Sequence, residues 1–266
     1  MPPPMQGRSC WPGDHRRRRR AAIRWSNIGA TKIASATMPA MDAPEPLSLE
    51  LPDGTRISAL LQVPQDAAAL YVFAHGAGAG MQHAGMASVA DALAGVRTAT
   101  LRYQFPYMER GSKRVDAPPV AHAAVRAAVA EAGRRHPTLP LFAGGRSFGG
   151  RMTSQAQALA PLDGVRGLAF VAFPLHPAGK PGVERAAHLA DVTLPMLFLQ
   201  GTRDDLADLP LLKSVVEPLA PRAMLHLVDD ADHSFHVRAS SGRKDADVVL
   251  ELARTLSAWF LANGRG

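Results

Sequence analysis

The sequence predicts an α/β fold, in which helices cover both faces of a mostly parallel sheet of about eight strands. Three observations lead to this prediction. The chain has 266 residues, 47% of them apolar, which is enough to bury one substantial core. From Leu70 onward, short apolar runs alternate with longer alanine-rich segments of helical periodicity. The runs are apolar throughout, as is typical of strands that are covered on both faces.

Two strands are expected before this alternation begins, at Leu47 to Leu51 and Ile57 to Val63. Gly54 lies in the turn between them and can adopt the positive φ that a tight hairpin requires. The six remaining strands are expected at Leu70 to Ala74, Thr98 to Arg102, Leu139 to Ala143, Gly167 to Phe173, Met196 to Gln200 and Ala223 to Val228. The helices are expected at Gln82 to Ala94, Pro119 to Arg135, Phe148 to Leu159, Leu209 to Val216 and Asp245 to Ala262.

Residues 175–192 form a loop that is too short for a separate lid domain, so we expect a fold without a lid. No apolar run approaches the length of a membrane span, and we expect no membrane association. The single cysteine, Cys10, allows no intrachain disulfide, which fits a cytoplasmic location.

The formal charge of +7 comes from the first 40 residues, which hold eight basic side chains and one acidic side chain. The rest of the chain is neutral, with 22 basic and 22 acidic residues, so nucleic-acid binding by the body is not expected. We predict that residues 1–44 are a basic, disordered extension and that residues 45–266 form the folded domain. Three alternatives stay open for the extension. The arginine run 16–20 makes a weak polyanion contact, the extension is a targeting peptide, or the given start lies too far upstream, since Met38 and Met41 immediately precede the first expected strand.

A candidate nucleophile follows the expected strand at Leu139 to Ala143. Residues 145–149 read GxSxG, with Ser147 between a strand and a helix and glycines on both sides. A sharp strand-to-helix turn lifts a serine oxygen clear of the sheet, and the glycines remove the Cβ atoms that would clash. The N-terminal amides of the following helix favour negative charge at this point. An ordinary strand-to-helix turn is the structural alternative.

A serine oxygen needs a base, and the base needs an orienting acid. Asp204, after the strand Met196 to Gln200, is the expected acid, with Asp205 as the alternative; we expect the other of the two to cap the next helix. His233, after the strand Ala223 to Val228, is the expected base, with His236 as the competitor. The order serine, acid, histidine along the chain is that of the α/β-hydrolase fold.

An oxyanion hole is expected from the loop after the strand Leu70 to Ala74, a glycine-rich run at 75–80. In this fold one amide follows the nucleophile and another comes from such a loop, which indicates the amides of Phe148 and Ala77. A dinucleotide-binding loop is disfavoured because the spacing is not GxGxxG and no carboxylate ends the next strand. His75 is interpreted as a structural hydrogen-bonding residue.

Side chains at two further strand ends are candidates for the walls of a substrate pocket, with core packing as the alternative. We expect no metal ion and no cofactor, because the acidic residues near His233 lie in one short loop without a second ligand cluster. The oligomeric state is left open. The expected pocket residues are Tyr103, Phe105, Tyr107, Met108, Leu175 and His176.

Several short motifs extend this pattern from about residue 45 to the end of the chain. They are the runs 75–80, 105–109, 145–152, 173–177, 179–181, 200–204, 232–233 and 241–243. On these motifs the chain resembles the dienelactone-hydrolase-like α/β-hydrolases, which include small bacterial hydrolases and animal testis-expressed and NSL-complex hydrolase-like proteins. The resemblance implies a lidless hydrolase with Ser147, Asp204 and His233 as its catalytic triad. True dienelactone hydrolases use a cysteine nucleophile, and the group often has proline at the position of Asp205.

These observations favour a serine hydrolase that cleaves a carboxylic ester or thioester of a small, accessible acyl substrate. Some animal members of the group are subunits of larger complexes, and a fold does not by itself guarantee catalysis. The alternative is therefore a non-catalytic interaction module built on the same fold.

Overall fold

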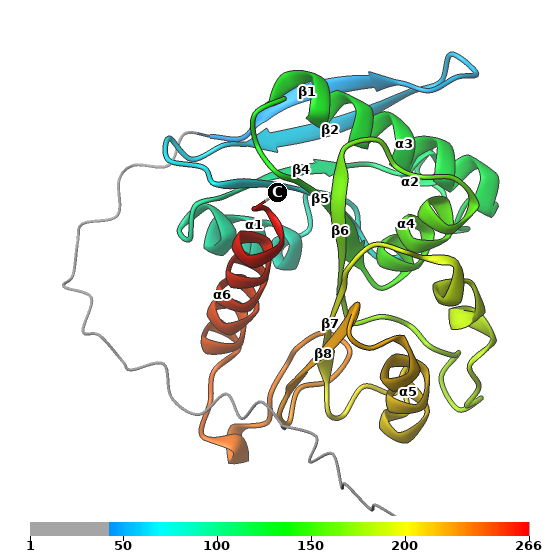
Figure 1. Ribbon diagram of the computed structural model, residues 1–266, viewed down its shortest axis with the longest axis vertical. Helices are drawn as coiled ribbons and strands as arrows, with labels where there is room; N and C mark the ends of the chain where they lie inside the picture. Colours follow the sequence, from blue (N-terminus) through cyan, green and yellow to red (C-terminus); the bar gives the residue numbers. More distant parts are fainter. Residues whose placement is uncertain (1–42, 266) are drawn as a thin grey trace, which may run out of the picture. The chain divides into compact units, whose positions relative to one another are not determined.

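The computed structural model describes residues 43–265 and contains one eight-stranded sheet (Figure 1). The strand order is β1-β2-β4-β3-β5-β6-β7-β8. β1 and β2 pair antiparallel, β2 pairs antiparallel with β4, and all other neighbours are parallel. The strands are β1 (Glu45–Glu50), β2 (Arg56–Gln62), β3 (Ala69–Ala74), β4 (Thr98–Tyr103), β5 (Leu141–Arg146), β6 (Val165–Val171), β7 (Met196–Gly201) and β8 (Ala223–Val228). The predicted fold class and its N-terminal hairpin are confirmed.

Helices cover both faces of this sheet. The α-helices are α1 (Ala84–Ala94), α2 (Pro106–Glu109), α3 (Pro118–Arg135), α4 (Phe148–Leu159), α5 (Leu209–Val216) and α6 (Asp245–Asn263). Figure 1 shows α6, in red, beside α1 on one side, with α3, α4 and α5 on the other. The buried side chains accordingly form two clusters, one under α1 and α6 and one under α3, α4 and α5. Each face of the sheet therefore has its own apolar layer.

Two strands, β5 and β6, end two or more residues away from their predicted ends, and both differences have a local cause. β5 begins later than expected and continues through Gly144 and Gly145 to Arg146, because these glycines stay extended against their neighbours. A Cβ added at Gly144 would lie 1.8 Å from the carbonyl oxygen of Ala169 on β6. β6 ends at Val171 rather than Phe173, because Ala172 has a φ of 58° and turns the chain out of the sheet.

The segment between β6 and β7, predicted as a loop, contains a 3-10 helix, η1 (Glu184–Asp191). η1 packs against α4. Two shorter 3-10 turns, η2 (Glu217–Leu219) and η3 (Ala239–Ser241), precede and follow β8 along the chain. No helix within residues 43–265 has the length and hydropathy needed to span a membrane. The predicted basic extension, residues 1–44, lies almost entirely outside the described residues.

Candidate active site

Ser147 occupies a strained turn between β5 and α4. Its φ is 49° and its ψ is −117°, a conformation that non-glycine residues rarely adopt and that costs about 1–3 kcal/mol. The Ser147 amide donates to the carbonyl of Val171 at 3.0 Å, so the turn is attached to the end of the neighbouring strand. The expected elbow geometry is present, and the strain is balanced by the packing around it.

Two glycines allow β3 to approach this turn closely. A Cβ added at Gly145 would lie 2.5 Å from the carbonyl oxygen of Ala74, the last residue of β3. A Cβ added at Gly149 would lie 2.6 Å from the carbonyl oxygen of His75. Real Cβ atoms do not come this close to backbone oxygens, so a larger residue at either position would push the 75–80 loop away from Ser147.

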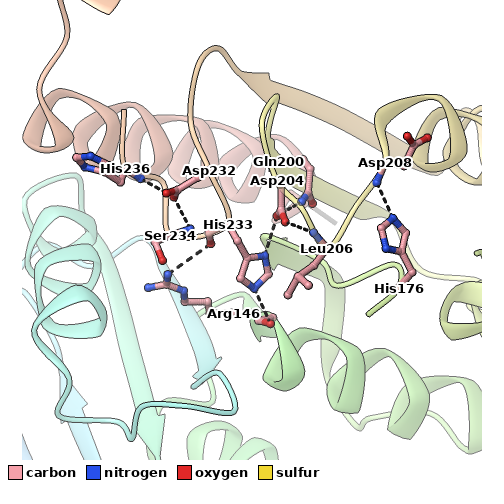
Figure 2. A network of polar contacts seen from close by, with 11 residues as sticks. Arg146, His176, Gln200, Asp204, Leu206, Asp208, Asp232, His233, Ser234 and His236 are labelled. Atoms are coloured by element: carbon pink, nitrogen blue, oxygen red, sulfur yellow. Dashed lines mark hydrogen bonds and ion pairs between the residues drawn. The ribbon is translucent and has the colours of Figure 1, made fainter. Parts of the chain in front are cut away.

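An unbroken chain of hydrogen bonds joins Asp204, His233 and Ser147. Nδ1 of His233 lies 2.7 Å from Oδ2 of Asp204, and Nε2 lies 2.9 Å from Oγ of Ser147 (Figure 2). A carboxylate only accepts, so Nδ1 carries the proton and donates it. Nε2 of the neutral ring is then unprotonated and accepts from the Ser147 hydroxyl. The ring is therefore oriented to remove a proton from Ser147.

Asp204 is held rigidly on the loop after β7. Its side chain is completely buried, Oδ1 accepts from the Leu206 amide at 2.8 Å, and Oδ2 also accepts from the side-chain amide of Gln200. Gln200 was not among the expected site residues, although its place at the end of a buried strand beside the acid was a usable signal. The neighbouring Asp205 is exposed.

The second carboxylate of this loop does not cap the next helix, contrary to expectation. The cap of α5 is Asp208, whose side chain accepts from the Leu211 amide at 3.0 Å. The chain needs four residues after Asp204 to leave the sheet edge before α5 can begin. Asp205 therefore lies in the connecting turn, beyond reach of the helix amides.

The loops that carry Asp204 and His233 are bonded to each other. The Thr202 amide donates to the carbonyl of Val228 at 3.0 Å, and the Arg203 amide donates to the carbonyl of Ala231 at 2.9 Å. A Cβ added at Gly201 would lie 2.3 Å from the same Ala231 oxygen, so glycine is required for this approach. The distance between acid and base is thus fixed by backbone contacts.

The backbone around His233 is supported from two sides, as Figure 2 shows. Asp232 accepts hydrogen bonds from the amides of Ser234 and His236, at 2.7 and 3.0 Å, which closes the turn. Arg146, beside the nucleophile, reaches the carbonyl of His233 with a long contact of 3.4 Å. Burial lowers the pKa of Arg146, and attraction to Asp232 and Asp204 opposes that shift.

The other two histidines considered in the sequence have structural surroundings. His236 is exposed and pairs with Asp245 at 2.9 Å, away from Ser147. His75 is completely buried, and its Nε2 accepts from the Phe105 amide at 3.0 Å. Burial lowers the pKa of His75, which keeps it neutral in this accepting role. Of the three candidate rings, only His233 contacts Ser147.

The two amides expected to form an oxyanion hole are unpaired within residues 43–265. Phe148 is the first residue of α4, so its N–H has no partner in the preceding turn of the helix. The Ala77 amide likewise donates to no other described residue, whereas its carbonyl accepts from the Tyr107 hydroxyl at 2.8 Å. Burial raises the pKa of Tyr107 to about 12, so the hydroxyl remains a donor and holds the loop.

Five of the six side chains expected to wall a pocket are buried, and none of the six lines either described groove, which favours the alternative of core packing. Met108 is half-buried against the core, and His176, only 4% exposed, accepts from the Asp208 amide at 2.9 Å. The structure has an open groove of about 500 Å³, but segment 202–210 and Arg238 line it. Strand-end aromatics packed under α3 and α4 instead, because apolar rings are most stable there. The fully buried members are Tyr103, Phe105, Tyr107 and Leu175.

A second serine–histidine pair was not foreseen. Oγ of Ser154, on α4, lies 2.7 Å from Nε2 of His188, on η1. Its sequence signal is weak, because a serine within a helix and a histidine in an expected loop suggest no contact. Among the described residues, no group of three or more histidine, cysteine, aspartate or glutamate side chains could hold a metal ion.

A family model described as "Alpha/beta hydrolase domain" matches residues 67–261 of the chain. The match contains all of the residues in the hydrogen-bonded chain from Asp204 to Ser147. It covers well over half of the sequence.

Several solved structures share the fold at low sequence identity. An α/β serine hydrolase without a lid from Xanthomonas campestris is 23% identical, with a TM-score of 0.64, over 82% of this chain and 95% of that chain. The esterase domain of a Rhodothermus marinus protein is 17% identical, with a TM-score of 0.64, over 83% of this chain and 99% of that one. A dienelactone hydrolase from Anabaena variabilis is 20% identical, with a TM-score of 0.66, over 84% of this chain and 99% of that chain.

Proposed function

Because the chain belongs to the alpha/beta hydrolase domain family, we propose that it is a serine hydrolase that cleaves a carboxylic ester or thioester through an acyl-enzyme on Ser147. The observation that carries this proposal is the hydrogen-bonded chain from Asp204 through His233 to Ser147, with distances of 2.7 and 2.9 Å. The esterase and serine-hydrolase neighbours share the fold and are consistent with this chemistry.

In the first half of the reaction, Nε2 of His233 takes the proton of the Ser147 hydroxyl as Oγ attacks the carbonyl carbon of the substrate. The new C–O bond places a negative charge on the former carbonyl oxygen, and the amides of Ala77 and Phe148 donate to it. Asp204 stabilises the imidazolium that forms. The tetrahedral intermediate then collapses, and the leaving alcohol or thiol takes the proton from His233.

In the second half, His233 takes a proton from water, whose oxygen attacks the acyl carbon. The second tetrahedral intermediate uses the same two amides. Its collapse breaks the bond to Oγ, Ser147 regains its proton from His233, and a carboxylic acid is released. The reaction consumes one water and needs no metal ion or redox partner.

The strained turn at Ser147 supports this mechanism. A φ of 49° raises Oγ above the end of β5, where it faces His233 and the N-terminus of α4. A conformation this costly persists where the surrounding packing over-determines it, and such positions concentrate at functional sites. The short connection between β6 and β7 places no separate domain over the site, which favours small or accessible acyl substrates.

The proposal is tested with a panel of aryl esters and acyl-thioesters of graded chain length, assayed with the wild-type protein, Ser147→Ala and Ser154→Ala. Ser154→Ala is the matched control, because Ser154 lies on α4, the helix that follows Ser147, and also contacts a histidine, His188. We expect wild-type turnover, loss of turnover by about 10⁴-fold or more in Ser147→Ala, and turnover of wild-type order in Ser154→Ala. Folded wild-type protein with no turnover on any member of the panel would favour the non-catalytic module instead.

A further inference from the structure

Arg151 is a half-buried cation that has no ion-pair partner among residues 43–265, and it lies one helical turn after the nucleophile. Its amide donates to the carbonyl of Ser147 at 3.1 Å. Its Nε is fully buried and makes no hydrogen bond, and no carboxylate of residues 43–265 pairs with its guanidinium. A buried guanidinium nitrogen that has lost water and gained no acceptor is costly. This arrangement suggests that the partner of Arg151 is a bound group.

A second arginine, Arg185, lies beside it on η1. The Ser154–His188 bond of 2.7 Å fixes η1 against α4. Both helices run from the carboxyl edge of the sheet toward its amino edge, since α4 follows β5 and η1 leads into β7. Arg151 comes three residues before Ser154 on α4, and Arg185 comes three residues before His188 on η1. Residues three apart lie on the same face of a helix, so each arginine is about one turn nearer the carboxyl edge of the sheet than the residue that forms the Ser154–His188 bond. Both arginines therefore lie at the same end of the contact between α4 and η1, and the charge of Arg185 acts on Arg151.

The electrostatics of this region favour an anion. Burial and the nearby charge of Arg185 both lower the pKa of Arg151. Burial and the charge of Arg151 lower the pKa of His188 to about 4, so His188 is neutral at pH 7 and does not add a third charge. Glu184 and Asp191 lie at the ends of η1, but neither forms an ion pair with either arginine in the described structure. Neither arginine has a paired carboxylate among residues 43–265, although the charge of Asp191 acts on the neighbouring His188.

The position of the arginines relative to Ser147 indicates which anion they meet. Side chains on an α-helix lean toward its N-terminus, so Arg151 leans back toward the turn that carries Ser147. The chain from β6 to η1 leaves the same edge of the sheet and ends next to Arg185. Arg151 follows Ser147 by one helical turn, so a group bound by Arg151 and a carbonyl at Ser147 would both lie at the N-terminal end of α4.

We propose that Arg151 and Arg185 bind an anionic group, a carboxylate or a phosphate, carried by the substrate beyond its scissile ester or thioester. Guanidinium pairs recognise both groups through charged, often bidentate hydrogen bonds. This inference rests on the proposed function and narrows it from acyl substrates in general to anionic ones.

The test uses two pairs of substrates that differ only in charge. One pair places the charge on the acyl part: the 4-nitrophenyl monoester of glutaric acid and the same compound with its free carboxylate methylated. The other places it on the alcohol part: 4-acetoxybenzoate and its methyl ester. We expect wild-type protein to prefer the anionic member of at least one pair by at least about tenfold in kcat/KM.

Arg151→Gln and Arg185→Gln should each lower this preference severalfold, chiefly through KM, and the double variant should abolish it. Arg254→Gln is the matched control, because Arg254 is an exposed arginine on α6, on the opposite face of the sheet. It should keep the wild-type preference. A merely structural role of Arg151 would lower both rates of a pair together and leave their ratio unchanged, which would overturn the proposal.

A binding measurement separates failure of this inference from failure of the proposed function. Glutarate and inorganic phosphate are titrated into Ser147→Ala and into the same protein with both arginines changed to glutamine, with the Tm as readout. We expect at least one of the two anions to raise the Tm of the protein that keeps both arginines, and neither to raise the Tm of the protein that lacks them. The anion that raises the Tm more identifies the group that the site prefers. Equal behaviour of the two proteins would contradict the anion site, even if ester hydrolysis is established. Stabilisation without hydrolysis of any substrate would retain the site and contradict the hydrolase.

Discussion

Two serine–histidine pairs start from the same helix but are built for different tasks. Ser147 lies 2.9 Å from His233, and Ser154 lies 2.7 Å from His188. By distance alone the second pair is the closer one. The difference lies in the groups behind each histidine and in the backbone beneath each serine.

The direction of the hydrogen bond is opposite in the two pairs. Ser154 donates its only hydroxyl proton to the carbonyl of Arg151 at 3.0 Å, so it accepts from Nε2–H of His188. Ser147 donates to His233, whose other nitrogen is bound to Asp204. His188 has no hydrogen-bonded carboxylate within the described residues. Only His233 is arranged as a base.

The backbone and the exposure also differ. Ser147 occupies a strained turn with a φ of 49°, whereas Ser154 lies in regular helix and is completely buried. Ser154 and His188 therefore join α4 to η1 and hold that part of the fold in place. The comparison teaches that a short serine–histidine distance identifies a site only together with an acid, a lifted serine and free amides.

Replacing the two histidines should separate the pairs most strongly. His233→Ala removes the base, and we expect kcat/KM for a hydrolysed aryl ester to fall by about 10⁴-fold or more. His188→Ala removes a buried contact and should cost about 1–3 kcal/mol of unfolding free energy while activity stays of the same order. Esterase assays and urea unfolding check both. Equal loss of activity in the two folded variants would break the distinction.

Replacing the carboxylates should show that the acid distinguishes the pairs. The Asp204→Asn side chain keeps the shape of aspartate, but it accepts the hydrogen bond from His233 Nδ1 less strongly and no longer fixes the tautomer of that ring. We therefore expect kcat to fall by about 10³–10⁴-fold. Asp205→Asn is the matched control, since Asp205 is exposed in the adjacent turn. Its kcat should remain of wild-type order. A larger loss of kcat in Asp205→Asn than in Asp204→Asn would show that Asp205, and not Asp204, is the acid.

Removing the Tyr107 hydroxyl should loosen the oxyanion loop without touching either pair. The hydroxyl donates to the carbonyl of Ala77, whose amide is one of the two expected oxyanion donors. We expect Tyr107→Phe to lower kcat by about three- to tenfold, with a loss of about 1 kcal/mol in unfolding free energy. Unchanged kcat would mean that the loop is held by other contacts.

Acidification should affect the buried pair through folding stability. The pKa of His188 falls from 6.5 to about 4 in the folded state, because the ring is buried beside Arg151. Between these values the unfolded chain binds more protons, so stability is fully present above about pH 6.5 and declines as the pH falls toward 4. The stability advantage of the wild type over His188→Gln in urea unfolding should shrink between pH 7 and pH 5. A constant or growing advantage would contradict the buried, neutral ring.

Much of this arrangement could be predicted from the sequence because it depends on local patterns. GxSxG after an apolar run fixes the place of Ser147, and the carboxyl ends of parallel strands bring Asp204 and His233 to the same edge. The apolar runs also located all eight strands, since each must be buried on both faces or paired at the edge.

The rest depends on contacts between distant segments, which leave little local signal. The aromatic side chains at 103–107 could equally wall a pocket or pack in the core, and only tertiary packing decides between the two. The cap at Asp208 depends on how far the chain travels before α5 begins. The Ser154–His188 contact requires a 3-10 helix in a segment with no clear periodicity, so the sequence could not place it.

Labelling with a fluorophosphonate, which reacts with activated serines, tests the central distinction most directly. The folded protein is treated with the probe, digested, and analysed by mass spectrometry to locate the adduct. We predict modification of Ser147, none of Ser154, and loss of labelling in Ser147→Ala. An adduct on Ser154, or no adduct on folded wild-type protein, would contradict the assignment of the activated serine to the strained turn.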